Sequence, residues 1–202
     1  MIAIVDYGVG NLFSLLSSLR ALDLEAEVTG DAGRLRAADR IILPGVGAFG
    51  DARAKLDATG LVPVIQEEAE KKPLLGICLG MQLLFQGGEE GRRCEGLGLI
   101  SGGVRRIETD LKLPHIGWNS LTFPRPSPLF RGLDEGCCVY FVHSFCGHTE
   151  DPDQAAAVTD YGGPVLAAVQ DAARGVFGCQ FHPEKSGETG LAILQNFAAL
   201  NR

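Results

Sequence analysis

The feature that most constrains the fold is the run Pro73–Gln82, in which an apolar segment meets a helix-forming segment at a cysteine. Leu74–Ile77 has the composition of a buried strand, and helix-forming residues begin at Leu79. Cys78 lies between the two, with a glycine two positions away on each side. This is the cysteine version of the Gly-x-Ser-x-Gly turn, which exposes a nucleophile at the carboxyl end of a sheet. The run therefore predicts a strand–turn–helix unit within an α/β sheet.

The two flanking glycines have a steric reason. We expect a Cβ atom at Gly76 or Gly80 to collide with neighbouring backbone, because strand and helix approach closely at such a turn. A helix amino terminus also stabilises the thiolate, which is the nucleophilic form of a cysteine. Cys78 is therefore a candidate for covalent chemistry on a carbonyl carbon. A single cysteine after a strand is more often an inert apolar residue, so this assignment requires partners elsewhere in the chain.

The first half of the chain alternates short apolar runs with helix-forming segments. Such runs of four or five apolar residues indicate a parallel sheet that is covered on both faces. Strands are expected at 2–6, 25–28, 40–43 and 74–77, with helical segments at 11–22, 31–37 and 66–70.

The second half, after residue 87, has shorter alternating segments with many glycines and prolines, which are typical of mostly antiparallel strands. Ser186 is a candidate N-cap of a final helix. We therefore predict one α/β domain over residues 1–202. It has a mostly parallel central sheet between helices, and added antiparallel strands in its second half. The later strands are expected at 104–107, 115–118, 139–142, 155–158, 165–169 and 175–181.

Composition excludes several classes of partner and site. The 202-residue chain has a net charge of −7, which argues against nucleic acid as a partner. No apolar run approaches the ~20 residues of a membrane span. The six cysteines form no Cys-x-x-Cys pair, and nothing at the amino terminus reads as an export signal, so we expect neither disulfides nor a metal site. A reduced, cytoplasmic protein is the expectation.

A second motif, Gly178–Ser186, supplies groups that a cysteine nucleophile needs. His182 and Glu184 follow an expected strand and are separated by one proline. A nucleophilic thiol requires a base that takes its proton, and the base requires a group that orients it. Residues at positions i and i+2 of an extended chain lie on one side, so His182 and Glu184 suit these two roles.

A third element is the loop Pro44–Gly47, at the end of a neighbouring strand. Ligands bind at the carboxyl ends of the strands in such sheets. The loop's glycines allow a peptide N–H of Val46 or Gly47 to turn inward, and the N–H of Leu79 at the helix start supplies a second donor. These groups are expected to form an oxyanion hole.

These residues resemble a known family. Gly76–Gln82 together with the distant His182-Pro183-Glu184 is similar to the class I (triad) glutamine amidotransferases. Within that family, further runs resemble the glutaminase subunits of imidazole glycerol phosphate synthase, in histidine biosynthesis. The resemblance extends from Asp6–Asn11 to the last helix, and the further runs are 44–49, 115–119, 140–144 and 182–186.

The resemblance implies hydrolysis of L-glutamine through a thioester on Cys78, with His182 as acid and base and Glu184 orienting it. It implies a flavodoxin-like fold and no cofactor. Gln82 and Glu90 are expected to hold the α-amino end of glutamine, and Gly47, Ser144 and Phe145 to line the remaining pocket. Phe145 stands where many relatives carry tyrosine, so this chain lacks that hydroxyl.

The resemblance also implies a partner, a (β/α)₈-barrel cyclase subunit that forms a heterodimer with this chain. The cyclase would receive ammonia through an internal tunnel. Four residues are expected at or near that interface: Trp118, Tyr140, His143 and Lys185.

Three other interpretations remain open from the sequence. A glutaminase that feeds pyridoxal phosphate synthase is disfavoured, because that group has a Gly-Gly-Glu-Ser-type loop where this chain has Gly45–Ala48. A cysteine peptidase or γ-glutamyl hydrolase would cleave a different substrate on a similar sheet. A non-enzymatic interaction subunit would not need the intact Cys78, His182 and Glu184.

Overall fold

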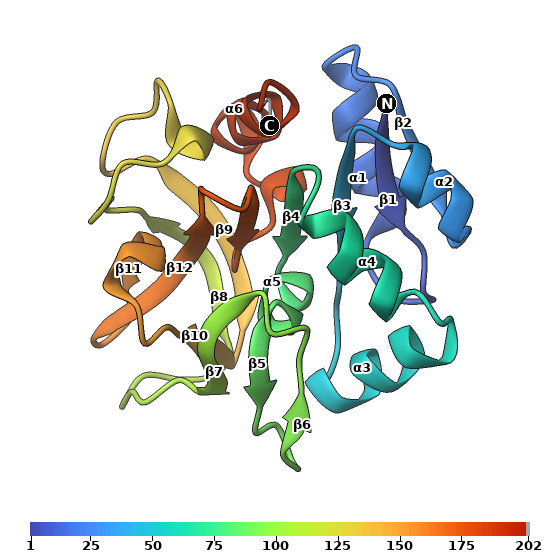
Figure 1. The fold of residues 1–202 in the computed structure, drawn as a ribbon. Coiled ribbons are helices and arrows are strands. Elements are labelled where there is room, and N and C mark those ends of the chain that lie inside the picture. Colours follow the sequence, from blue (N-terminus) through green and yellow to red (C-terminus); the bar gives the residue numbers. More distant parts are fainter. Residues whose placement is uncertain (201–202) are drawn as a thin grey trace.

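The computed structural model describes residues 1–200 and is built on a seven-stranded sheet (Figure 1). The five strands from β13 to β2 are parallel to one another, and the two at the other edge are antiparallel. This confirms the expected sheet with antiparallel additions from the second half. In spatial order the strands are β11 (Ala155–Asp160), β12 (Pro164–Asp171), β13 (Val176–Cys179), β4 (Leu74–Ile77), β3 (Arg40–Leu43), β1 (Ile2–Val5) and β2 (Ala26–Thr29).

Helices cover both faces of this sheet, each with its own apolar core. Helices α1 (Leu12–Ala21) and α6 (Gly187–Ala198) pack on one face. The other face carries α2 (Ala32–Ala37), α3 (Phe49–Ala58), α4 (Val62–Ala69) and the short α5 (Leu79–Leu83). The sequence did not predict α3, because its buried positions include Gly50 and Ala52 and give only a weak apolar pattern.

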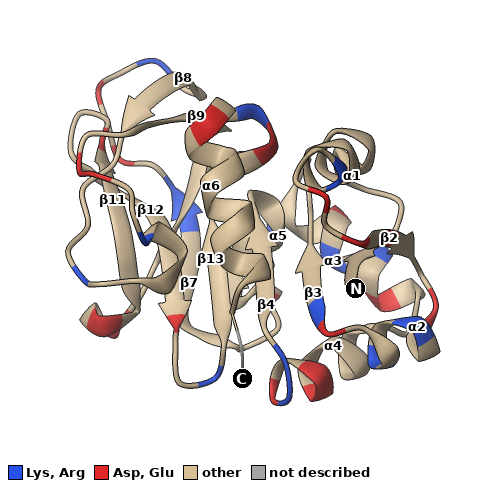
Figure 2. Ribbon diagram, turned by 90° about the horizontal axis from the view of Figure 1, so that it is seen from above, with Lys and Arg blue, Asp and Glu red and all other residues tan. Residues whose placement is uncertain are grey.

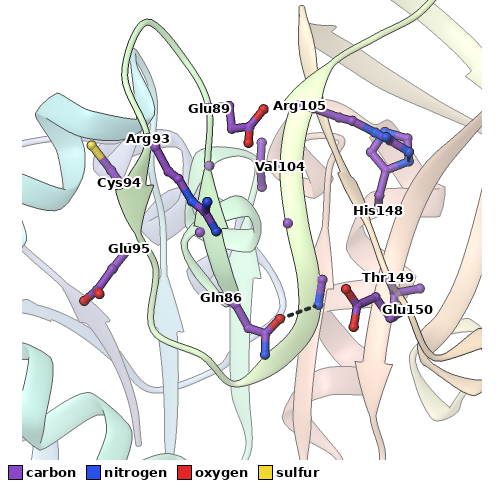
Figure 3. Close-up of a pocket in the computed structure, with 14 residues that line it drawn as sticks. Gln86, Glu89, Arg93, Cys94, Glu95, Val104, Arg105, His148, Thr149 and Glu150 are labelled. Atoms are coloured by element: carbon purple, nitrogen blue, oxygen red, sulfur yellow. Dashed lines mark hydrogen bonds between the residues drawn. The ribbon is translucent and has the colours of Figure 1, made fainter.

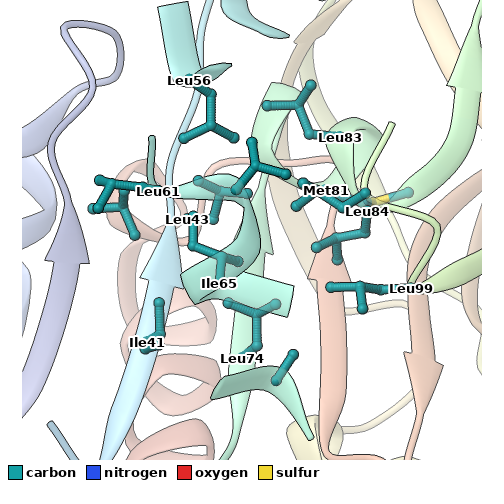
Figure 4. Packing of buried hydrophobic residues seen from close by; sticks show 14 of the residues in the cluster. Ile41, Leu43, Leu56, Leu61, Ile65, Leu74, Met81, Leu83, Leu84 and Leu99 are labelled. Atoms are coloured by element: carbon teal, nitrogen blue, oxygen red, sulfur yellow. The ribbon is translucent and has the colours of Figure 1, made fainter. Parts of the chain in front are cut away.

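Successive residues of each central strand contribute to opposite cores. Ala3 and Val5 face the helices α2 to α5, whereas Ile2 and Ile4 face α1 and α6. Because both faces are covered, the strands are apolar along their whole length rather than alternating with polar residues. Figure 4 shows the first of these cores, where Ile65 of α4 lies near Leu43 and Leu74 of the strands and Met81 of α5.

A smaller four-stranded sheet extends the molecule beyond α5 (Figure 1). The sequence predicted only part of it, since its strands are rich in glycine. One glycine has a steric reason: a Cβ at Gly147 would lie 2.2 Å from the Phe85 ring. The strands are, in spatial order, β10 (Phe145–His148), β7 (Ile100–Arg106), β5 (Phe85–Gly88) and β6 (Cys94–Glu95), and a separate ribbon pairs β8 (His115–Ser120) with β9 (Cys138–His143).

Charged residues lie mainly on the outer helices and loops. In Figure 2 basic residues mark α2, acidic residues mark α4, and both kinds lie on the surrounding loops, whereas the central strands carry few. Within residues 1–200, no helix has the length and apolar character that crossing a bilayer would need. All six cysteines are free thiols.

Loss of core packing around α4 should destabilise the fold. Ile65 is fully buried, so Ile65→Ala is expected to lower the free energy of unfolding by about 2–5 kcal/mol. Phe13→Ala is the matched control, because Phe13 is 82% exposed and its truncation should change stability by less than ~0.5 kcal/mol. Denaturation in urea measures both, and equal losses in the two variants would contradict this account of the core.

Candidate active site

Cys78 occupies a strained turn between β4 and α5. Its φ of 54° and ψ of −112° are rare for a residue with a side chain, as expected for a nucleophile at a strand-to-helix turn. The predicted role of the glycines is confirmed. A Cβ at Gly80 would lie 1.8 Å from the Leu43 carbonyl oxygen, and one at Gly76 would lie 2.7 Å from the Gly80 oxygen.

Strand pairing brings the histidine motif to this turn. Strand β13 lies next to β4 and parallel to it, with Cys179 opposite Ile77. The Cys78 N–H donates to the Cys179 carbonyl at 2.7 Å, so the two strand ends stay in register. His182 follows three residues after Cys179. Cys78 and His182 consequently line one pocket of about 320 Å³.

His182 and Glu184 form a buried pair. His182 Nδ1 donates to Glu184 Oε1 at 2.8 Å, and the two side chains are 3% and 2% exposed. Burial opposes the imidazolium form, but interaction with the Cys78 sulfur and with Glu184 outweighs it and raises the pKa of His182 to about 9. Nε2 of His182 is buried and has no hydrogen-bond partner within residues 1–200. This nitrogen is therefore the one left for a thiol or a substrate.

Ser186 fixes the turn that carries this pair. It occupies the N-cap position of α6, as predicted, but its side chain makes no capping hydrogen bond. Its hydroxyl instead donates to the His182 carbonyl at 2.6 Å and accepts from the Tyr140 N–H at 3.0 Å. The residue thus ties the histidine turn, which includes the short helix η3 (Pro183–Lys185), to strand β9.

The loop after β3 lies against the start of α5. A Cβ at Gly45 would be 2.8 Å from the Gly80 nitrogen, so only glycine allows this approach. Val46, Gly47 and Leu79, the expected oxyanion residues, all line the pocket with Cys78. Leu79 is the first residue of α5, so its N–H has no acceptor within the helix.

Tyr7 is a site residue that the sequence did not indicate. Its hydroxyl donates to the Pro44 carbonyl at 2.7 Å and so anchors the loop after β3. Burial, reinforced by the Cys78 sulfur, raises the pKa of Tyr7 well above its usual range, and the phenol therefore remains a donor. Tyr7 lies two residues after β1 and within the run Asp6–Asn11 that resembles the family, and these were the available signals.

The residues expected to hold glutamine line the same pocket: Gln82, Glu90, Ser144 and Phe145. Gln82 Nε2 donates to the Phe145 carbonyl at 2.9 Å and to Gln180 Oε1 at 3.0 Å. Both amide hydrogens are thereby used, so Oε1 is left to accept from an ammonium group. Glu90 Oε2 accepts from the Phe49 N–H at 2.8 Å, at the start of α3.

Gln180 is a second residue that sequence reasoning missed. It is fully buried, and its Nε2 lies 3.9 Å from the Cys78 sulfur. The sequence places it in the expected strand 175–181 without a role, whereas β13 ends at Cys179, one residue before Gln180. A glutamine next to a run of apolar residues was the available signal, since buried amides need polar partners.

The four expected interface residues separate into two groups. Trp118 is 57% exposed, its ring meets that of Tyr140 edge to face at 6.1 Å between centroids, and Lys185 is exposed nearby on η3. His143 is only 7% exposed and lines the pocket with Cys78 and His182. The structure therefore places His143 in the wall of the site and not on the surface. No cluster of three or more potential metal ligands occurs within residues 1–200.

Removing the Glu184 charge should change how His182 holds its proton. With a folded-state pKa of about 9, against ~6.5 in the unfolded chain, the proton stabilises the fold below pH ~6.5, and this contribution is lost as the pH rises to 9. In Glu184→Gln we expect the pKa of His182 to fall and the stability change between these pH values to become smaller. An NMR titration and urea midpoints measure the two effects. Glu188→Gln, an exposed position on α6, should behave as the unmodified chain, and identical titrations of all three proteins would contradict the pairing.

Comparison with known proteins agrees with this site. Over residues 3–200 the sequence matches the family described as "Glutamine amidotransferase class-I". The chain is 50% identical over 203 residues to "Imidazole glycerol phosphate synthase subunit HisH" of Moorella thermoacetica, covering 100% of this chain and 95% of that one. It is 48% identical to the protein of the same name from Caldanaerobacter subterraneus subsp. tengcongensis, covering 99% and 98% of the two chains.

Solved structures share the fold. "Structure of PurLQS from Thermotoga maritima" has a TM-score of 0.76 at 22% identity and covers 98% of this chain and 96% of that chain. A putative GMP synthase subunit from Thermoplasma acidophilum has a TM-score of 0.75 at 23% identity, covering 97% and 90%. The chain belongs to the class I glutamine amidotransferases and, within them, to the family of the imidazole glycerol phosphate synthase subunit HisH.

Proposed function

We propose that the whole chain acts as one amidotransferase domain, the glutaminase subunit of an imidazole glycerol phosphate synthase, which hydrolyses L-glutamine to glutamate and ammonia. The observation that carries this proposal is that Cys78 and His182 line one pocket and that Glu184 accepts a hydrogen bond from His182, in a chain half identical to HisH proteins along its length. This identity also favours the proposal over a pyridoxal phosphate synthase subunit. The reaction belongs to histidine biosynthesis, needs no cofactor and is expected in the cytoplasm.

The first half of the reaction forms a thioester. The proton of the Cys78 thiol is held on His182 Nε2, in keeping with the raised pKa of His182, and the sulfur attacks the side-chain amide carbon of glutamine. The oxygen that becomes negatively charged is stabilised by the N–H of Leu79 and by an N–H of the Val46–Gly47 segment. His182 then returns its proton to the amide nitrogen, the C–N bond breaks, and ammonia leaves.

The second half restores the enzyme. A water molecule gives a proton to His182 Nε2 and attacks the thioester carbon, and the C–S bond breaks with the sulfur as leaving group, so that the proton again lies on His182. Glutamate is the product. Throughout, Glu184 accepts from Nδ1, which keeps Nε2 directed away from the carboxylate and stabilises the charged imidazolium.

Binding of the free amino acid requires groups that recognise its ends. Gln82 Oε1 and the Glu90 carboxylate are proposed to accept hydrogen bonds from the α-ammonium group. Gly47, Ser144 and Phe145 line the rest of the pocket. Phe145 offers a ring and a backbone carbonyl but no hydroxyl.

Ammonia is proposed to pass to a cyclase subunit of (β/α)₈-barrel fold through a tunnel. A second, very small cavity borders His182 and Glu184 and is also lined by Asn11, Pro44 and Gly45. It lies between the start of α1, the loop after β3 and the histidine turn, and supports an exit on that side of the triad.

The proposed docking surface surrounds the same turn and consists of Phe13, Ile116, Trp118, Tyr140 and Lys185. Helix η3, which carries Lys185, contacts α1 and β9. Phe13 on α1 is 82% exposed, and Ile116 and Trp118 on β8 are 58% and 57% exposed. Exposed apolar side chains of this size on one side of a molecule are typical of a protein interface.

Replacing the nucleophile should abolish the glutaminase activity of the complex and leave the ammonia-dependent activity of the cyclase. We expect Cys78→Ala to abolish glutamate release and covalent trapping by diazo-oxo-norleucine, while the complex with the cyclase still uses added ammonium salts. Cys138→Ala, at an exposed cysteine, should retain both activities. Glutamate assays and intact-protein mass spectrometry provide the measurements. Residual trapping at another cysteine in Cys78→Ala would contradict the assignment.

Truncation within the docking surface should weaken the complex. Trp118→Ala is expected to reduce affinity for the cyclase by about 30-fold or more, which corresponds to the ~2 kcal/mol of an interface hot spot. Leu111→Ala is the matched control, since Leu111 is an exposed apolar side chain (49%) outside the surface. Isothermal titration calorimetry measures both affinities. A loss in Leu111→Ala equal to that in Trp118→Ala would argue against this surface.

A further inference from the structure

Two buried histidines lie beside the triad without a part in the hydrolysis described above. His115 begins strand β8 and is 3% exposed, and His143 ends β9 directly opposite and is 7% exposed. His115 Nδ1 lies 3.2 Å from His143 Nε2. Burying two imidazoles costs desolvation free energy that apolar side chains in a core would not, so their arrangement requires an explanation.

The partners at each end fix where the protons of this pair lie. His143 Nδ1 is 2.9 Å from the Phe145 carbonyl oxygen, which can only accept, so Nδ1 carries the hydrogen. In the neutral ring Nε2 must then accept, and His115 Nδ1 is its donor. His115 Nε2 in turn accepts from Asn119 Nδ2 at 3.3 Å.

The orientation of the Asn119 side-chain amide fixes the first donor in this series of hydrogen bonds. Its Oδ1 accepts from the Ser120 N–H at 2.8 Å, which identifies the other side-chain atom as the amide nitrogen. That nitrogen also donates to the Asp160 carbonyl at 2.8 Å. Every hydrogen bond from Asn119 to Phe145 therefore points in one direction, and both imidazoles are required in the same Nδ1–H tautomer.

The surroundings keep the pair neutral and immobile. Burial lowers the pKa of His143 to about 4, with a smaller contribution in the same direction from His115 and His182, and burial also lowers the pKa of His115. The His115 ring is stacked between Phe141 and Tyr161, with centroid distances of 4.7 and 4.0 Å. At neutral pH the chain of bonds thus holds no charge that could compete with the imidazolium of His182.

The last acceptor in this series of hydrogen bonds, the Phe145 carbonyl, is next to the glutamine pocket. The Phe145 carbonyl accepts from His143 and also from Gln82 Nε2, and both His143 and Gln82 line the pocket with Cys78. The position of this oxygen therefore determines the orientation of the Gln82 amide. Gln82 Oε1 is the atom proposed above to receive the α-ammonium group.

The first residues in this series of hydrogen bonds, Asn119 and His115, lie on strand β8, which also carries part of the proposed docking surface. Successive residues of β8 point to opposite sides, so His115 faces the interior while Ile116 and Trp118 are exposed. A displacement of β8 would reach the Phe145 carbonyl through only two imidazole rings.

We propose that His115 and His143 are positioning residues, which hold the Phe145 carbonyl and through it the Gln82 amide, and which link glutamine binding to the ribbon β8–β9. The kinetic part of this proposal rests on the proposed glutaminase function. The positions of the protons on the two imidazoles do not depend on that function, so the proton positions and the kinetics can be tested separately.

The first test concerns the tautomers in the unmodified chain. The protein has four histidines, so two-bond ¹H–¹⁵N correlation spectra can be assigned by single substitutions. We expect His115 and His143 both to be neutral Nδ1–H tautomers at pH 7, the less common form of a free imidazole side chain. An Nε2–H tautomer or an imidazolium at either position would overturn the proposal, whatever reaction the protein catalyses.

The second test uses glutamine kinetics of the complex with the cyclase. His143→Leu removes the donor to Phe145 and should raise KM for glutamine about tenfold with kcat changed less than about threefold, which corresponds to the loss of one buried hydrogen bond. His143→Asn places an amide nitrogen near the position of Nδ1 and should keep KM within about twofold of the unmodified value. His115→Phe retains the stacking but not the bond and should raise KM by an intermediate factor.

His148→Leu is the matched control. His148 is also partly buried, but it lines a separate groove of the four-stranded sheet together with Arg93 and Arg105 (Figure 3), where Arg105 lies 3.0 Å from its Nδ1. Its substitution should leave KM unchanged. Equal KM values for His143→Leu and His143→Asn would overturn the positioning role. Absence of glutamate release by the unmodified complex would instead overturn the proposed function and leave the tautomer result standing.

Discussion

The site depends on the parallel pairing of β4 with β13. This pairing places two strand ends side by side, and the hydrogen bond from the Cys78 N–H to the Cys179 carbonyl continues the ladder by one residue beyond the sheet. The chain between Cys78 and His182 includes a second sheet and a ribbon, yet it ends one strand away from where it began. Backbone hydrogen bonds between neighbouring strands therefore bring Cys78 and His182 close to each other, and side-chain contacts add only the final orientation.

Close approach of backbones is the second requirement. Helix α5 begins so near to β3 that a side chain at Gly80 would overlap the Leu43 carbonyl, and the loop after β3 reaches α5 only because Gly45 has no side chain. These contacts bring the expected oxyanion residues into the pocket that Cys78 lines. They also explain why Cys78 tolerates a left-handed backbone, since the elements on both sides leave no alternative path.

The sequence predicted those parts of the molecule where a local pattern has one interpretation. Apolar runs such as Arg40–Leu43 and Leu74–Ile77 became strands with the expected bounds, and the glycines around Cys78 indicated the turn. The short strands Phe85–Gly88 and Phe145–His148 were not predicted, because their glycines interrupt the apolar pattern and the strands depend on contacts such as Phe85 over Gly147. Tyr7 and Gln180 were missed for a related reason. Their roles arise from long-range hydrogen bonds that no local pattern encodes.

The Tyr7 hydroxyl joins the segment that follows β1 to the segment that follows β3, while Gly45 rests against the helix that follows β4. Three adjacent crossover connections are thus fastened to one another at the rim of the sheet. The rim is accordingly held together by its own contacts, and these are separate from the two apolar cores that keep the molecule folded.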